Sequence, residues 1–342
     1  MKFLSSRALA LLAACAALIV HSSAAGGASW TRVSGGVPGG TTLAVAVDPA
    51  RPNTLVAAAG AGLFRSPNRG ARWALRARVA APSQILAAGP GTFYFVEGDS
   101  RRRVWKSSDA GLTWALANLG WAQPSSLSAD PLAPDTLYIL YNFYVFPFDI
   151  HNDPVIYRSQ DGGANWAPLA DLPDACSAFD IAVGRTSAAP AVLYFSGSRP
   201  GGTECRASVW RSQDGGTSWT EAAAGLPGIA VELAVDPRDS RIVYARLGDN
   251  LNGLLWRSTN SGASWQVSGL RQRSIDKLAV SPAGTVWVSI QRKVYRSTDF
   301  GATWQQRGTL TASIFGFAFD PVDPDRVYAA TGSGVWVLED KP

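Results

Sequence analysis

A ten-residue phrase that recurs along the chain constrains its fold more than any other feature. The phrase YRSQDGGANW at Tyr157–Trp166 is nearly repeated as WRSQDGGTSW at Trp210–Trp219. Both fit the pattern Ser-x-Asp/Asn-x-Gly-x-x-Trp, which occurs six times, and we call each copy a box. The six boxes are Ser66-Asn68-Gly70-Trp73, Ser107-Asp109-Gly111-Trp114, Ser159-Asp161-Gly163-Trp166, Ser212-Asp214-Gly216-Trp219, Ser258-Asn260-Gly262-Trp265 and Ser297-Asp299-Gly301-Trp304.

The spacing of the boxes points to a repeat architecture. Their tryptophans are 41, 52, 53, 46 and 39 residues apart. A period of this size is typical of repeat proteins, and it matches the chain needed for a four-stranded propeller blade. Between the boxes, short runs of Val, Leu, Tyr and Phe alternate with Gly, Pro, Asp and Asn. This pattern predicts an all-β fold with many turns.

A second motif runs in phase with the boxes. An apolar run ends in Asp-Pro, a polar turn follows, and another apolar run leaves. Pro fixes φ in such a turn, and the Asp side chain can accept a hydrogen bond from the backbone two residues on. Each repeat therefore predicts strand A, a turn, strand B, a loop, strand C, the box and strand D. The four copies are Val47–Ala58, Ala129–Leu140, Val235–Arg246 and Phe319–Ala330.

The two ends of the chain complement each other. Six repeats end in a box, and a seventh, Ile314–Asp340, stops after strand C. The missing strand D is found at the other end, because ASWTRVSGGVPG at Ala28–Gly39 matches TSWTEAAAGLPG at Thr217–Gly228. Trp30 then stands in place of a box tryptophan. We expect one seven-bladed β-propeller over residues 26–342, whose last blade is completed by the N-terminal strand, so that no sheet edge is left free.

The boxes resemble the Asp-box, or BNR, repeat of sialidases, sortilin-type ectodomains, xyloglucanase-type glycosidases and photosystem II assembly factors. The resemblance covers essentially the whole chain after its first residues, and it implies a β-propeller. Resemblance to sialidases also implies six blades and an Arg-Ile-Pro sequence, which this chain lacks. Resemblance to xyloglucanases implies cleavage in a groove between two propellers, whereas a single propeller is predicted here.

The residues of the box suggest a structural role. Asn68 and Asn260 replace Asp in two boxes. Asn keeps the accepting oxygen but has no charge, which a metal ligand or a general acid would not tolerate equally well. We expect Ser and Asp or Asn to shape the turn, Gly to allow positive φ, and Trp to pack between blades. The alternative is that the box acids bind calcium or take part in acid–base chemistry.

The N-terminus has the anatomy of a secretory signal. A basic start is followed by the uncharged run Ala8–Val20 and by small residues ending at Ala25. We expect a signal peptide over residues 1–25 and export, either into a bacterial periplasm or into the medium. The apolar run is short for a membrane span. As an alternative, LAAC at Leu12–Cys15 resembles a lipobox, which would place a lipid anchor on Cys15.

Charge and cysteine usage exclude several classes of function. Loss of the signal peptide lowers the formal net charge from +5 to about +3. The chain contains no block of like charge long enough to bind nucleic acid, so no nucleic-acid partner is expected. Cys176 and Cys205 remain as an even pair, which predicts a disulfide in an oxidising compartment, the alternative being two free thiols. No His/Cys cluster has metal-binding spacing, so we expect no metal or cofactor. We also expect the protein to be a monomer.

The predicted topology separates the loops into two sets. The A–B turns and the boxes lie at one end of the blades, and the B–C and D–A connections lie at the other. The B–C loop of blade 1 is only Gly60–Gly62, whereas four consecutive blades carry longer ones. These are Glu97–Arg103, Tyr141–Pro154, Ser196–Ser208 and Leu247–Gly253. Long loops on a rigid scaffold are where binding residues tend to lie.

Two groups of side chains on these loops are candidates for binding. Aromatic rings in the blade 3 loop can contact a protein or stack on a sugar, or else they cover the channel mouth as a small core of their own. Arginines can bind carboxylate or phosphate groups, or else they are solvated and neutralised by nearby acids. The candidates are Tyr141, Phe143, Tyr144, Phe146, Phe148, His151, Arg101, Arg102, Arg103 and Arg199, with Arg206 beside them.

The sequence favours an exported, non-catalytic propeller that binds a protein or glycan partner through its long loops. The alternative is a glycoside hydrolase that uses carboxylates on the same face, for which Asp149, Asp153 and Asp249 are candidates. Glycosidases need two carboxyl groups about 5–10 Å apart across the bond that is cleaved. Fold alone does not choose between these two functions.

Overall fold

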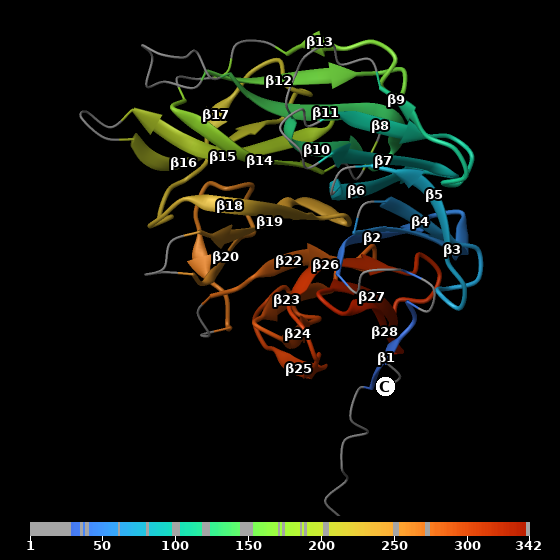
Figure 1. Ribbon diagram of the computed structural model, residues 1–342. Coiled ribbons are helices and arrows are strands. Elements are labelled where there is room, and N and C mark those ends of the chain that lie inside the picture. Colours follow the sequence, from blue (N-terminus) through green and yellow to red (C-terminus); the bar gives the residue numbers. More distant parts are fainter. Residues whose placement is uncertain are drawn as a thin grey trace, which may run out of the picture.

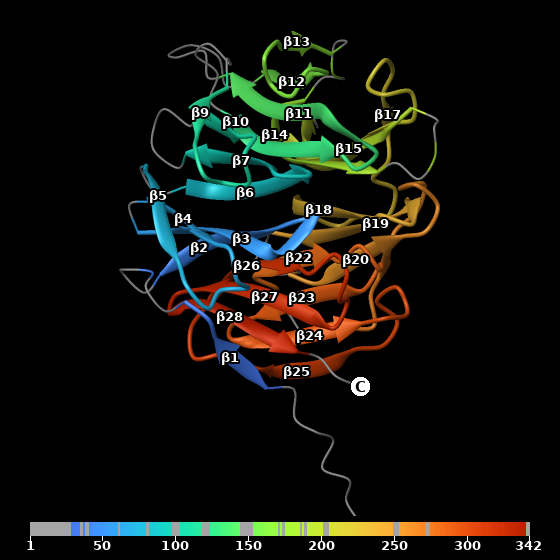
Figure 2. The ribbon, with the colours of Figure 1, turned by 90° about the vertical axis from the view of Figure 1, so that its right-hand side faces the viewer.

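The chain forms β-strands arranged as a propeller. The computed structural model describes residues 29–34, 37, 41–60, 62–79, 82–97, 103–117, 124–143, 153–169, 172, 175–184, 187, 190–200, 205–248, 253–270 and 274–339. These residues form 28 strands in seven four-stranded antiparallel sheets, with no helix among them. The sheets follow one another around the molecule in chain order (Figures 1 and 2). The predicted all-β, seven-bladed propeller is therefore confirmed.

Each blade is built from strands A to D, with A innermost. Strands A are β2 (Thr42–Asp48), β6 (Pro82–Gly89), β10 (Pro124–Asp130), β14 (Ser177–Gly184), β18 (Ala230–Asp236), β22 (Lys277–Val280) and β26 (Ile314–Phe319). Strands B are β3 (Arg51–Ala59), β7 (Thr92–Glu97), β11 (Ala133–Phe143), β15 (Val192–Pro200), β19 (Asp239–Leu247), β23 (Val286–Ile290) and β27 (Arg326–Thr331). Strands C are β4 (Gly62–Ser66), β8 (Val104–Ser107), β12 (Asp153–Ser159), β16 (Cys205–Ser212), β20 (Leu255–Ser258), β24 (Lys293–Ser297) and β28 (Gly334–Glu339). Strands D are β5 (Ala74–Arg78), β9 (Ala115–Leu116), β13 (Ala167–Pro168), β17 (Thr220–Glu221), β21 (Gln266–Val267), β25 (Gln305–Thr309) and β1 (Trp30–Arg32).

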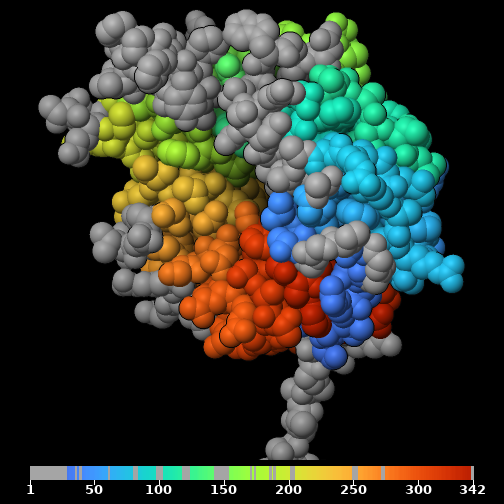
Figure 3. Space-filling view, viewed as in Figure 1, coloured from blue at the N-terminus to red at the C-terminus, as the bar shows by residue number. Residues whose placement is uncertain are grey.

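The N-terminal strand closes the ring as predicted. β1 pairs with β28 in blade 7, with Trp30 opposite Leu338 and Arg32 opposite Trp336. In the space-filling view this blue segment lies among the red C-terminal strands (Figure 3). The indole Nε1 of Trp30 donates to the carbonyl oxygen of Arg307 in blade 6 at 2.7 Å. Trp30 thus joins the last two blades in addition to completing the sheet.

The hydrophobic core is a ring of interfaces between neighbouring blades. Each core cluster combines residues from two consecutive blades, and one of them joins blade 7 to blade 1. Strand B supplies most of the fully buried side chains, such as Tyr194, Tyr244 and Trp287. Because every sheet buries both faces against its neighbours, these strands read as continuous apolar runs without polar alternation.

The four Asp-Pro turns form as predicted. In each of them the Asp is buried and Oδ1 accepts from the backbone N–H two residues on, for example from Ala50 to Asp48 at 3.0 Å and from Leu132 to Asp130 at 2.9 Å. Asp236 and Asp320 make the same contact with the backbone of their own turns. The side chain therefore holds each hairpin between strands A and B.

The long B–C connections differ from the sequence-based expectation, because part of their length is strand. In blade 4, β15 continues to Pro200 and β16 begins at Cys205, with these two residues paired. In blade 3, β11 and β12 pair as far as Phe143 opposite Asp153. Residues inserted near a hairpin tip can pair their backbone N–H and C=O groups by extending the ladder of strand hydrogen bonds. In an irregular loop, these groups would have to bond to solvent instead.

Two further searches concern only the described residues. No helix among them is long and apolar enough to cross a membrane. No three His, Cys, Asp or Glu side chains in the same residues are grouped so that they would hold a metal ion.

Candidate functional site

The strand order places two kinds of connection at opposite ends of the blades. The A–B turns and the boxes lie at one end, which we call the box face. The B–C and D–A connections lie at the other end, which we call the loop face. The two faces differ in how their polar side chains are used.

On the box face, Ser and Asp or Asn hold each turn through local hydrogen bonds. In blade 3, Ser159 donates to Asp161 Oδ1 at 2.8 Å, and the same oxygen accepts from the backbone N–H of Asn165 at 2.9 Å. The uncharged box of blade 5 is built in the same way, with Asn260 Oδ1 accepting from Ser264 N–H at 3.0 Å. The turn needs the oxygen of the side chain and forms without its charge.

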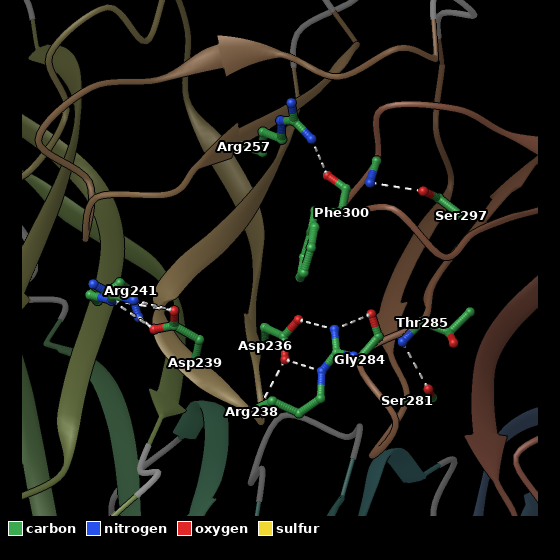
Figure 4. Close-up of polar contacts among 11 residues, drawn as sticks. Asp236, Arg238, Asp239, Arg241, Arg257, Ser281, Gly284, Thr285, Ser297 and Phe300 are labelled. Atoms are coloured by element: carbon green, nitrogen blue, oxygen red, sulfur yellow. Dashed lines mark hydrogen bonds and ion pairs between the residues drawn. The ribbon is translucent and has the colours of Figure 1, made fainter.

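In blades 1, 2, 4 and 5, the basic residue before the box serine joins neighbouring blades. Its side chain donates to a carbonyl in the next box, as Arg257 does to Phe300 at 2.6 Å (Figure 4). The acceptor residue has a left-handed backbone, with φ of 59° at Phe300, which non-glycine residues rarely adopt. The other such pairs are Arg65 with Ala110, Lys106 with Gly162 and Arg211 with Ser261.

The hydrogen bonds of the box also fix its protonation state. The backbone N–H and side-chain amide of Asn165 lower the pKa of Asp161 to about 2. The Thr303 hydroxyl and backbone N–H lower the pKa of Asp299 to about 2. A carboxyl group with such a pKa carries no proton to donate near neutral pH, which argues against a general acid in the box.

On the loop face, only part of the blade 3 candidate group falls within the described residues. Tyr141 and Phe143 belong to β11 and pair in register with Val155 and Asp153 of β12. Burial raises the pKa of Tyr141. The remaining predicted residues lie outside the described part of the chain, namely Arg101, Arg102, Tyr144, Phe146, Phe148, Asp149, His151 and Asp249.

Arg103 lies in a local cluster on blade 2. Its Nε donates to Glu97 Oε2 at 2.7 Å, and Trp105 Nε1 donates to the same oxygen at 3.3 Å. The guanidinium carbon lies 5.5 Å from the centre of the Trp105 ring. The Glu97 side chain is almost fully buried, so Arg103 compensates a carboxylate that would otherwise be costly to bury.

Arg199 and the predicted disulfide lie together on blade 4. Cys176 and Cys205 form a disulfide, which joins the start of strand A to the start of strand C. Arg199 Nε donates to Glu221 Oε1 at 2.8 Å, and Ser208 Oγ donates to the same oxygen at 2.7 Å. The disulfide indicates an oxidising environment during folding.

A groove of about 920 Å³ runs beside this disulfide between blades 4 and 5. Its apolar lining includes Phe179, 37% exposed, with Leu226 and Ile229. Arg199, Arg206 and Glu221 supply its charged groups, so the described lining carries one net positive charge. The groove therefore combines an apolar floor with cations and holds a single described carboxylate, which is paired.

Sequence reasoning missed a second polar feature, in the central channel. Strands A of all seven blades line this channel, which has a volume of about 540 Å³. Asp180 lies in it and accepts from Ser126 Oγ and from Leu233 N–H, both at 2.7 Å. Burial raises the pKa of Asp180 to about 6 against these hydrogen bonds, and the nearby Glu232 adds to the shift. A polar residue near the start of an otherwise apolar strand A was the available signal.

Asp180 and Glu232 are two neighbouring carboxyl groups, but each of them already accepts hydrogen bonds. Glu232 Oε2 accepts from Arg246 Nε at 2.7 Å and from Leu278 N–H at 3.2 Å. Both oxygens of Asp180 accept hydrogen bonds. The contacts link neighbouring blades, which favours a structural use of this carboxyl pair over acid–base catalysis.

Comparison with known proteins supports the fold. No protein-family model matches the chain, and no curated protein sequence matches it. Among solved structures, an ancestral GH74 enzyme matches with TM-score 0.67 and 15% identity over 90% of this chain, which spans 46% of that enzyme. YCF48 from Cyanidioschyzon merolae matches with TM-score 0.64 and 16% identity, covering 91% of this chain and 98% of that one.

Two further structures extend this comparison. YCF48 bound to a D1 peptide matches with TM-score 0.63 and 16% identity, over 92% of this chain and 97% of that chain. The extracellular domain of BT4673 from B. thetaiotaomicron matches with TM-score 0.61 and 12% identity, over 91% of this chain and 39% of that one. At these identities the likeness shows the propeller fold alone.

Proposed function

We propose that the protein is an exported, non-catalytic Asp-box propeller that binds a protein or glycan partner through its loop face. The groove between blades 4 and 5 carries this proposal, since it places an exposed aromatic ring beside two arginines. An apolar floor with neighbouring cations suits an extended segment that has apolar and acidic side chains. On the box face, the polar groups of the boxes are used within and between blades, which supports a structural role there.

The comparisons and the disulfide support the proposal in part. A YCF48 structure of similar length and fold contains a bound D1 peptide. The Cys176–Cys205 disulfide supports export, as does the signal peptide expected over residues 1–25, which lies outside the described residues. The repeated box with its local hydrogen bonds supports membership of the Asp-box group.

An array of peptides and glycans tests the proposal with two matched variants. Arg199→Ala removes an arginine paired with Glu221 on the loop face, and Arg241→Ala removes one paired with Asp239 on the box face (Figure 4). We expect the wild type to bind a subset of the array, Arg199→Ala to lose about tenfold in affinity, and Arg241→Ala to bind normally. Absence of binding, or equal loss in both variants, would refute the proposal.

Glycoside hydrolysis is the second candidate, favoured by the fold match to a GH74 enzyme of about twice the length. The groove has one described carboxylate, Glu221, which is paired with Arg199. A panel of fluorogenic glycosides, tested on the wild type and on Asp149→Ala, separates the two functions. Turnover by the wild type that is lost in Asp149→Ala would establish hydrolysis and overturn the non-catalytic proposal.

A further inference from the structure

Seven equivalent positions in the central channel form what we call the channel ring. In blades 1 to 6, each is the strand A residue that faces the strand B residue three positions after the partner of the box serine. In blade 7, which has no box, the corresponding residue is Gly316, opposite Ala330. The position lies near the loop-face end of strand A. The ring residues, from blade 1 to blade 7, are Ala44, Gln84, Ser126, Asp180, Glu232, Lys277 and Gly316.

Four consecutive ring residues bind the backbone of the next blade. Asp180 Oδ2 accepts from Leu233 N–H at 2.7 Å, and Glu232 Oε2 accepts from Leu278 N–H at 3.2 Å. In both cases the N–H group belongs to the residue that follows the ring residue of the next blade. In the other two contacts, Ser126 Oγ accepts from Ile181 N–H at 3.5 Å, and Gln84 Oε1 accepts from Leu127 N–H at 3.3 Å.

Gln84 shows what the exposed strand edge can bind. Its amide also donates from Nε2 to the carbonyl oxygen of Leu127 at 2.9 Å. One residue of strand A therefore offers both an N–H and a C=O group toward the channel, as an unpaired edge of an antiparallel ladder does. A group that both donates and accepts, such as an amide or a hydroxyl, satisfies this edge.

The remaining three junctions lack such a contact. Lys277 has only donors, and Ala44 and Gly316 have no polar side chain. The residues after the next ring positions, Phe317 and Val45 among them, occupy the same register as Leu233 and so turn the same edge toward the channel. Blades 6, 7, 1 and 2 therefore border a sector of the channel whose strand edges receive no side chain from the preceding ring residue.

This sector is open and carries a cation. A Cβ atom added at Gly316 would meet no heavy atom within 4 Å, so the place that a side chain fills in other blades is vacant space. Lys277 pairs with Ser289 through its backbone and lines the channel, and among the described residues its side chain forms no hydrogen bond or ion pair. The adjacent carboxylate of Glu232 is compensated by Arg246 at 2.7 Å. The ammonium group of Lys277 thus forms no ion pair in the sector, although it interacts electrostatically with the carboxyl group of the preceding residue, Asp276.

We propose that this sector of the channel binds a small hydroxycarboxylate anion. Its carboxylate pairs with Lys277, and its hydroxyl groups, which donate and accept, satisfy the strand edges at Phe317, Val45 and Ile85. Such a molecule fits within the channel volume of about 540 Å³, which is in the usual range for small-ligand sites. The residues of this sector do not line the groove between blades 4 and 5, although Phe179 and Val231 border both the channel and that groove.

Isothermal titration calorimetry with three four-carbon probes measures separately how much the carboxylates and the hydroxyl groups contribute to binding. L-tartrate has carboxylates and hydroxyls, succinate lacks the hydroxyls, and erythritol lacks the carboxylates. We expect tartrate to bind and the other two to bind at least about tenfold more weakly, the effect of losing charge-assisted or edge hydrogen bonds. Equal binding of all three, or no tartrate binding at about 10 mM, would overturn the proposal.

Matched variants locate the binding. Lys277→Gln removes the charge and should weaken tartrate binding about tenfold, whereas Lys293→Gln, at an exposed lysine of β24 in the same blade, should leave it unchanged. Gly316→Leu fills the open space and should abolish binding, with circular dichroism and thermal unfolding confirming the fold. Unchanged affinity in Lys277→Gln, or equal loss in Lys293→Gln, would refute the site, whatever the result for Gly316→Leu.

Discussion

At the scale of single residues, carboxyl groups of this protein titrate in opposite directions according to their surroundings. The box acids Asp161 and Asp299 accept hydrogen bonds at the solvent-exposed turns, which lower their pKa to about 2. Asp180 lies in the central channel, where burial raises its pKa to about 6 despite its hydrogen bonds. The two kinds of carboxyl therefore give the protein two distinct dependences on pH.

The box acids should make the fold sensitive to strong acid. Because their folded pKa values lie below the unfolded value of about 4, their contribution is present above pH 4 and is lost as pH falls through about 2. Urea unfolding at pH 5 and pH 2 measures this loss in the wild type and in a triple Asp→Asn variant at Asp161, Asp214 and Asp299. We expect a smaller loss in the variant; an identical loss would mean that the boxes do not contribute.

Asp180 should behave in the opposite way. Its raised pKa means that the contribution of its protonated form is complete below about pH 4 and disappears as pH rises through about 6. Carbon-13 NMR of the labelled carboxyl group reports the titration directly. We expect a midpoint near 6, and a midpoint at or below about 4 would show that the channel does not desolvate the group.

At the scale of elements, the hairpin of β15 and β16 is held near its tip by the disulfide, since Cys205 pairs with Pro200 there. Cys176–Cys205 closes a segment of 29 residues and ties this hairpin to the start of β14. Removing the bond should lower the free energy of unfolding by about 3–4 kcal/mol, chiefly because the unfolded chain gains freedom.

Denaturant unfolding of a Cys176→Ser/Cys205→Ser variant measures this change. We also expect amide exchange to rise most in β14 and the β15–β16 hairpin, since the bond lies there. A loss of stability below about 1 kcal/mol, with exchange unchanged in this hairpin, would contradict the structural role of the disulfide.

At the scale of the whole molecule, ring closure depends on a short strand far from its partners in sequence. β1 pairs only with β28, and Trp30 packs against the cluster of blades 6 and 7. Because Trp30 is partly buried, Trp30→Ala should destabilise the protein by about 2–3 kcal/mol, less than the loss of a fully buried tryptophan. Thermal unfolding compares it with Trp219→Ala, which removes a box tryptophan and leaves the closure intact. A negligible effect of Trp30→Ala would show that closure does not need this strand.

Much of the fold could be predicted from the sequence because its structural motifs repeat. The boxes and the Asp-Pro turns rest on local hydrogen bonds, which a short motif encodes. The closure could be inferred because Trp30 copies a box tryptophan. In contrast, the groove beside Arg206 and the channel ring around Asp180 join residues of several blades, and an isolated polar residue in strand A does not show which residues of other blades it meets. Their strand registers had to be known first.

If partners bind at the loop face, hydrogen–deuterium exchange with the strongest binder from the peptide and glycan array will show protection there. We predict slower exchange in residues 175–184, 196–200 and 222–231, which border the groove between blades 4 and 5. Box turns such as residues 258–265 should exchange as in the unbound protein. Protection confined to the box turns, with the groove segments unchanged, would show that partners do not bind at the loop face.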